Sequence, residues 1–362
     1  MRARRTGISG SLGAVVGLVL LAATGCSGSA AADKAGGHSA AKPVELTLAT
    51  PMGTSEEFES FLLNVEMLSH GSIRIQVQTD AHHQEGPDFE TRLLDDVKQG
   101  RVDLAALGSR AFDSTGARPL RALTAPLLIT GYDAEEKVLA APVARRMVRE
   151  VDGDGLTGVG LLPGTLRRPL GARTPLLGPA DYKGRTIGEQ QSQVADATLR
   201  ALGAKPVAFP AGGSVDAFGG YEQQLTSGDG NRYDKNGMIA TANVVLWPRP
   251  VVLVAGTKAF QRLTSDQRAV LRKAGQQAVS GSAAVLRSHE KESLGNLCRR
   301  GQKLATATPS QLAGLRKAVQ PVYDQLARDR RTKEYLDAIT SLVRNIPAEP
   351  TVSCKGMTST TD

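Results

Sequence analysis

Apolar residues recur along the chain at two spacings, one typical of strands and the other typical of helices. Residues 44–49 and 73–78 alternate apolar and polar side chains, which predicts half-buried strands. Residues 102–108 form a nearly continuous apolar run, typical of a buried parallel strand. Between these stretches, residues 58–68 and 89–99 carry apolar side chains at helical spacing. The order strand, helix, strand, helix, strand indicates an α/β fold.

The middle of the chain repeats this pattern around a polar loop. A short β-branched stretch at residues 185–187 precedes the hydrogen-bonding run Glu-Gln-Gln-Ser-Gln at 189–193, and residues 194–202 follow with helical spacing. Residues 156–162 predict a further strand, and residues 214–226 predict a helix. In an α/β protein the loop after a strand lies at the carboxyl edge of the sheet, where ligands usually bind. The polar loop is therefore a candidate ligand-binding segment.

The length of the chain favours two lobes. At 362 residues it is too long for one ordinary hydrophobic core, so we expect two α/β lobes. Two segments are expected to cross between them: residues 164–168, and an extended stretch at 238–255 that Pro248 and Pro250 interrupt. From residue 264 to 342 the pattern is helical, which predicts long C-terminal helices.

A signal-like segment occupies the start of the chain. A basic stretch precedes an apolar run at residues 8–23 that is too short for a secure membrane span, and small residues lead to Cys26. This resembles a bacterial lipoprotein signal, which implies that residues 1–25 are removed and that Cys26 receives the lipid. An ordinary secretory peptide with an incidental cysteine is the alternative. The Ala-, Gly- and Ser-rich residues 26–43 are expected to be a flexible tether.

The charge distribution argues against binding to nucleic acid. The formal net charge is +8 and falls to +5 without the three arginines of the signal. This excess is spread along the chain and has no interleaved aromatic residues, so it indicates mild attraction to anions or to an anionic membrane.

Two cysteines remain after Cys26. Outside the cytoplasm, Cys298 and Cys354 are expected to form a disulfide, and two free thiols are the alternative that spacing leaves open. Neither cysteine has a histidine at metal-ligand spacing, so we expect no zinc site.

Catalytic motifs are not found in the sequence. There is no G-x-S-x-G elbow, no P-loop and no dinucleotide fingerprint after a strand, so we expect neither enzymatic activity nor a cofactor. His82 and His83, with Glu85 and Asp88, can be read as metal ligands. Adjacent histidines between a strand and a helix more often form a polar loop, and we expect no metal there.

Several phrases, occurring in a fixed order, carry a family resemblance. They are Gly100-Arg101-Val102-Asp103-Leu104 before Ala125-Pro126-Leu127-Leu128, Asp181-Tyr182-Lys183-Gly184 before Leu202-Gly203-Ala204-Lys205-Pro206-Val207, Tyr221-Glu222-Gln223-Gln224-Leu225 before Gly228-Asp229-Gly230, and Phe260-Gln261-Arg262-Leu263-Thr264. In this order the chain resembles a solute-binding protein of the TRAP transporter type, in the dicarboxylate-binding subgroup.

The resemblance implies a fold and a function. The fold is periplasmic-binding-protein-like, with two α/β lobes joined by a hinge and long C-terminal helices. The lobes close over a small polar or anionic organic solute, because contacts from both lobes exist only in the closed state. The protein is then extracytoplasmic, lipid-anchored to the cell membrane, and delivers the solute to membrane permease subunits. A ligand sensor or interaction lipoprotein on the same fold, without a transport role, is the alternative.

The expected division of the chain follows from the crossing segments. Residues 44–163 with 250–285 are assigned to lobe 1, and residues 164–249 with 286–345 to lobe 2. Residues 346–362 form a tail.

The resemblance also implies ligand-binding residues. In the family an arginine after the Asp-x-Lys-Gly turn forms a two-pronged salt bridge with the ligand carboxylate, but the matching position here is Gly188. Arg167 or Arg168 matches a second arginine of the cleft. Further candidates are assigned by position: Thr50, Ser109, Gln191, Ser192, Asn243 and Trp247. With glycine at position 188, the polar loop is better suited to neutral hydrogen bonding than to clamping a carboxylate.

Overall fold

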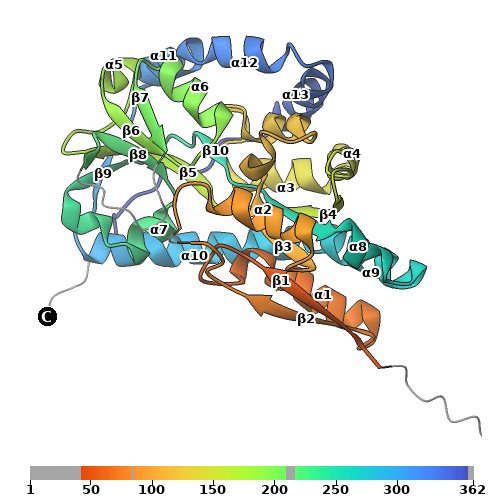
Figure 1. Cartoon of the computed structure of the whole chain (residues 1–362). Helices are drawn as coiled ribbons and strands as arrows, with labels where there is room; N and C mark the ends of the chain where they lie inside the picture. Colours follow the sequence, from red (N-terminus) through yellow and green to blue (C-terminus); the bar gives the residue numbers. More distant parts are fainter. Residues whose placement is uncertain (1–41, 84, 209–216, 358–362) are drawn as a thin grey trace, which may run out of the picture. The chain divides into compact units, whose positions relative to one another are not determined.

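Two β-sheets form the framework of the structure (Figure 1). This computed structural model describes residues 42–83, 85–208 and 217–357. Within them, the first sheet has the strand order β2-β1-β3-β11-β4, and the second has the order β12-β9-β5-β8-β6-β7, with β10 paired to β5. The strands are β1 Val44–Ala49, β2 Ile73–Gln78, β3 Leu104–Gly108, β4 Leu156–Leu162, β5 Leu166–Ala172, β6 Thr186–Glu189, β7 Lys205–Ala208, β8 Gly220–Gln223, β9 Met238–Thr241, β10 Trp247–Pro248, β11 Val251–Gly256 and β12 Lys303–Ala305.

Helices pack against both sheets. We call the first sheet with its helices the first half of the molecule, and the second sheet with its helices the second half. In the first half, α9 contacts β4 and α1, and α2 contacts β3 and β11. In the second half, α6 contacts β6 and β7. The helices are α1 Glu59–Ser69, α2 Phe89–Gln99, α3 Tyr132–Ala140, α4 Pro142–Arg149, α5 Pro179–Tyr182, α6 Gln193–Ala201, α7 Leu225–Gly230, α8 Thr257–Gln261, α9 Ser265–Gln277, α10 Val279–Arg299, α11 Pro309–Ala318, α12 Gln320–Leu326 and α13 Arg330–Val343. None of these described helices is both long and apolar enough to span a bilayer.

The apolar pattern decides which strands lie at the centre of the first sheet. Every residue of β3 and β11 is buried, as expected for strands with neighbours on both sides. The edge strand β2 is instead largely exposed after Ile73. β1 pairs in parallel with β2 and β3, whereas β11 runs antiparallel to β3 and β4.

The chain passes between the sheets after β4, again after β10, and a third time between β11 and β12, and the first two of these crossings touch. β4 belongs to the first sheet and β5 to the second, while β10 and β11 make the return. At the crossing the backbone N–H of Arg249 donates to the carbonyl of Thr165 at 2.9 Å, and a Cβ at Gly164 would collide with the carbonyl oxygen of Arg249. The long helix α10 contacts α1 from the first half and α7 from the second. These features confirm the predicted α/β fold with two lobes and C-terminal helices.

The helix predicted over residues 214–226 is wrong at Gly220–Gln223, and among its described residues only the last two fall in an α-helix, α7. Residues 209–216 lie outside the described part of the chain, and Gly220–Gln223 form strand β8 between β5 and β6. A Cβ at Gly220 would lie 2.6 Å from the carbonyl oxygen of Leu170, so a residue without a side chain is needed for this close approach. Pairing with two neighbours overrides the local preference of a polar segment.

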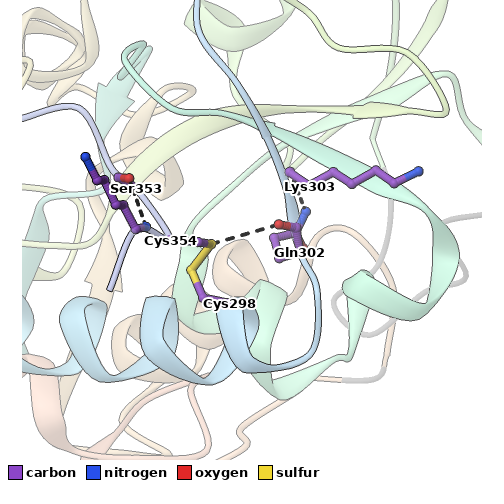
Figure 2. The surroundings of a disulfide bond; sticks show 6 residues. Cys298, Gln302, Lys303, Ser353 and Cys354 are labelled. Atoms are coloured by element: carbon purple, nitrogen blue, oxygen red, sulfur yellow. Dashed lines mark hydrogen bonds between the residues drawn. A yellow bond between two sulfur atoms is a disulfide. The ribbon is translucent and has the colours of Figure 1, made fainter. Parts of the chain in front are cut away.

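The predicted disulfide between Cys298 and Cys354 is confirmed (Figure 2). Cys298 is buried near the end of α10, and Cys354 lies on the terminal segment, with 5.2 Å between the two Cα atoms. The same segment is held by backbone hydrogen bonds from Val352 to Ala242 at 3.1 Å and from Glu349 to Thr130 at 2.9 Å. The terminal segment therefore connects elements that are distant in sequence.

Candidate functional site

A cavity of about 790 Å³ lies between elements of the two halves. One wall comes from α2 and the residues after β3, and the other comes from the end of β6, the loop that follows it, and the helices α6 and α12. The polar lining residues are Thr91, Arg110, Asp113, Ser114, Glu189, Gln191, Ser192, Gln193, Asp196, Arg200 and Gln325. The structure thus places Gln191 and Ser192, both predicted as ligand-binding residues, on the cavity wall.

Asp113 joins the two walls at the N-terminus of α6. Ser192 is the N-cap residue, and its Oγ accepts from the backbone N–H of Ala195 at 3.3 Å. From the opposite wall, Asp113 Oδ2 accepts from the backbone N–H of Gln193 at 2.7 Å and from Ser192 Oγ at 3.3 Å. Arg121 also donates to Gln193 Oε1 at 2.6 Å. The halves are therefore already bridged by their own side chains at this point.

A buried ionic network lies beneath the first wall. Glu90 accepts from Arg110 Nε at 2.6 Å, from Arg249 Nη2 at 2.7 Å and from the backbone N–H of Gly108 at 2.9 Å. Arg249 Nη1 also donates to both carboxylate oxygens of Glu57, at 2.8 and 3.1 Å. Burial would raise the pKa of Glu90, but the two guanidinium groups and the backbone donor hold it at about 2. Glu90 is therefore ionised and fully engaged.

Arg167 and Arg168 are both buried and paired with protein carboxylates. Arg167 donates through Nε to Glu222 and through Nη1 to Gln224 Oε1 at 2.5 Å. Its neighbour on β5, Arg168, donates through Nη2 to Glu290 Oε1 at 3.0 Å. Neither arginine is among the residues that line the cavity.

Two acidic side chains on the cavity wall hold their protons more tightly than usual. Burial raises the pKa of Glu189 to about 7, and the nearby Glu222 adds to the increase. Burial likewise raises the pKa of Asp113 to about 6, although its hydrogen bond from Gln193 and the charge of Arg121 act against the increase. Glu189 Oε2 accepts from the backbone N–H of Ser192 at 2.9 Å.

The other predicted ligand-binding residues lie off this cavity. Thr50 is buried, and its hydroxyl accepts from the backbone N–H of Met52 at 3.3 Å. Ser109 donates its backbone N–H to Pro250 at 2.8 Å. The side-chain amide of Asn243 exchanges two 2.8 Å hydrogen bonds with the backbone of Ala307.

Trp247 and Gly188 serve the framework in this structure. Trp247 is buried in the apolar cluster of the second half. Gly188 lies within β6, opposite Tyr221 of β8 and Val207 of β7.

Sequence reasoning missed the acidic members of the site. Glu90, Asp113, Glu189 and Glu222 were not predicted as site residues, although Glu189 begins the polar loop. A signal was present for Asp113, because it follows a buried strand at a sheet edge where ligands bind. The pairings of Glu90 and Glu222 join residues too far apart in sequence to be read locally.

The adjacent histidines belong to a polar loop of hydrogen bonds. His82 contacts Glu85 at 2.6 Å and Asp96 at 2.7 Å through its two ring nitrogens, and His83 Nδ1 lies 2.8 Å from the carbonyl of Pro51. Across the described residues, no three His, Cys, Asp or Glu side chains are grouped as metal ligands would be.

The chain matches known proteins over most of its length. The family model described as bacterial extracellular solute-binding protein, family 7 (DctP), matches residues 48–329. The C4-dicarboxylate-binding periplasmic protein DctP of Rhodobacter capsulatus is 22% identical over 291 residues, which cover 77% of this chain and 83% of that protein.

Solved structures share the fold. A TRAP periplasmic solute-binding protein from Xanthobacter autotrophicus with bound β-D-galacturonate superposes with a TM-score of 0.71 at 21% identity, covering 82% of this chain and 99% of that chain. The sugar acid binding protein DctPAm from Advenella mimigardefordensis, in complex with galactonate, has a TM-score of 0.71 at 18% identity and covers 84% and 98% of the two chains. The predicted periplasmic-binding-protein type of the fold is therefore confirmed.

Proposed function

This chain belongs to the bacterial extracellular solute-binding protein family 7, and on that basis we propose that it captures a small polar or anionic organic solute and presents it to membrane permease subunits. The observation that carries the proposal is the polar cavity whose walls come from both halves. A solute held there contacts residues after β3 and residues of the β6–α6 loop at once. Such a solute stabilises the closed arrangement, since contacts to both halves are lost on opening.

A ligand screen tests this function. Thermal-shift and calorimetric measurements with organic acids, sugars, polyols and amino acids should reveal at least one class that raises the melting temperature in a concentration-dependent way. Ser192→Ala should weaken the binding of that class, because Ser192 lies on the cavity wall and caps α6. Silence across the whole library would contradict the proposal.

We also propose how the chain is divided and anchored. The passage of the chain between the sheets supports lobe 1 at residues 44–163 with 250–285 and lobe 2 at residues 164–249 with 286–345. Cys26 lies outside the described residues, and the small residues before it support lipid attachment there. Cys26→Ser should move the protein from the membrane fraction to the soluble fraction, and unchanged fractionation would contradict the anchor.

The residue at position 188 bears on the ligand. We propose that Gly188 stands where dicarboxylate-binding relatives carry their carboxylate-binding arginine. In support, the Asp181-Tyr182-Lys183-Gly184 turn precedes Gly188, and Gly188 lies in the short strand β6 that follows the turn.

A further inference from the structure

The arginines around the cavity already have carboxylate partners within the protein. Arg167 is paired with Glu222, and Arg249 lies between Glu57 and Glu90. Each of these three carboxylates is buried. A ligand carboxylate that took one of these arginines would leave a buried carboxylate without its counter-charge, which is strongly unfavourable.

The charges that face the cavity are also compensated. Arg110 reaches the cavity wall, but its Nε is bound to Glu90 at 2.6 Å, and both side chains are nearly buried. Asp196 and Arg200 pair with each other at 2.8 and 3.1 Å on α6. Arg110 and Arg200, the two arginines that line the cavity, are therefore each already paired with a protein carboxylate.

The helix N-terminus at the cavity is occupied as well. The free backbone N–H groups at the start of a helix are a common site for anions. Here Ser192 caps α6 from within, and Asp113 accepts the N–H of Gln193 from the opposite wall. The carboxylate of Asp113 therefore occupies the position at the helix N-terminus where an anionic ligand would bind.

The cavity wall instead offers a hydrogen-bond acceptor and a hydrogen-bond donor to a solute. Glu189 is buried, it lines the cavity, and within the described part of the chain no donor reaches its Oε1. Arg110 lines the same cavity and donates to protein only through Nε in the described structure. A hydroxyl group can donate to the acceptor and accept from the donor without bringing charge into the cavity.

We propose that the solute is an uncharged polyhydroxylated compound, such as a neutral sugar or polyol, and that Glu189 is the residue that rejects the corresponding sugar acid. This rests on the proposed function and adds the class of solute to it. The mechanism of rejection is repulsion: a ligand carboxylate beside Glu189 and Asp113 would place like charges together in the cavity. The raised pKa of Glu189 fits the same picture, because burial and Glu222 already disfavour negative charge at this place.

Matched ligands that differ in one substituent test the proposal. Calorimetry at pH 8 would compare pyranoses that differ in one substituent: galactose with galacturonate and galactosamine, and glucose with glucuronate. The open-chain pair sorbitol and gluconate would be compared in the same way. We expect at least one neutral member to bind about tenfold or more tightly than its acid. Glu189→Gln should narrow that ratio by about tenfold, mainly by improving binding of the acid. Glu59→Gln makes the same charge change on an exposed residue of α1 outside the cavity, and should leave the ratio unchanged.

The outcomes separate this inference from the proposed function. Tighter binding of the acid or the amine, or a library in which only carboxylates bind, would overturn the inference and leave the solute-binding function standing. If Glu189→Gln leaves the ratio of the two affinities unchanged, Glu189 is not the residue that rejects the acid. Silence with every ligand class would overturn both.

Discussion

Removing the Cys298–Cys354 disulfide should lower the free energy of unfolding by about 4 kcal/mol. The two cysteines are 56 residues apart in sequence, so the bond closes a long loop in the unfolded chain. For a loop of this length the chain-entropy relation gives about 14 cal/mol/K, which is about 4 kcal/mol at 25 °C. The perturbation is the double variant Cys298→Ala with Cys354→Ala, because a single replacement would leave a reactive thiol.

Urea titration at neutral pH measures this effect. The wild type and the double variant would both carry Cys26→Ser, so that the disulfide is the one difference between them. Unfolding would be followed by far-UV circular dichroism and by the fluorescence of Trp247, which is buried in the second half. We expect the urea midpoint to fall. The wild type with a reducing agent is the matched control and should approach the double variant.

A loss of less than about 1 kcal/mol would refute the entropic reasoning. That result would mean that the terminal segment detaches before the rest of the protein unfolds, so that the loop is not part of the cooperative transition. Faster amide exchange near Val352 in the double variant, with unchanged exchange in β3 and β11, would identify this case.

Three further substitutions test the interior. Arg249→Met should cost about 3–5 kcal/mol in urea titrations, because it leaves Glu57 buried without a cationic partner and removes one of the two guanidinium groups that bind Glu90. A loss below about 1 kcal/mol would contradict the network. Burial holds the pKa of Glu189 near 7, above its usual value of 4.5, so the folded state binds this proton more tightly than the unfolded state. The free energy of unfolding should therefore fall as pH rises from 4.5 to 7, and Glu189→Gln should remove that part of the slope, by about 1–3 kcal/mol; an unchanged slope would contradict the assignment. Gly164→Ala should lower the melting temperature by several degrees or prevent folding, because its Cβ meets the carbonyl oxygen of Arg249, whereas Gly116→Ala, with open space around its Cβ, should have little effect. Equal melting temperatures for the two glycine variants would mean that the crossing can relax.

The helices and strands were predicted from sequence more accurately than the residues of the site. Strands such as 102–108 and helices such as 89–99 were visible because their apolar periodicity depends only on neighbours in the chain. The helix predicted over 214–226 was wrong at Gly220–Gln223, because β8 is held there by two partner strands. Gln191 and Ser192, predicted as ligand-binding by the rule that loops at sheet edges bind ligands, lie on the cavity wall, and their contact with a ligand stays a prediction.

The sequence alone determined most of the order of elements, the two-lobed α/β fold and the family resemblance, and it made Cys298 and Cys354 a candidate pair. These follow from local periodicity, length and composition. Tertiary structure decided which charges remain available. Arg167 meets Glu222 across 55 positions, and Arg249 meets Glu90 across 159 positions, so no local pattern shows that the arginines are already neutralised. Electrostatic compensation depends on distance in space and on burial, and both are set only when the chain folds: Arg167 and Glu222 meet because β5 pairs with β8.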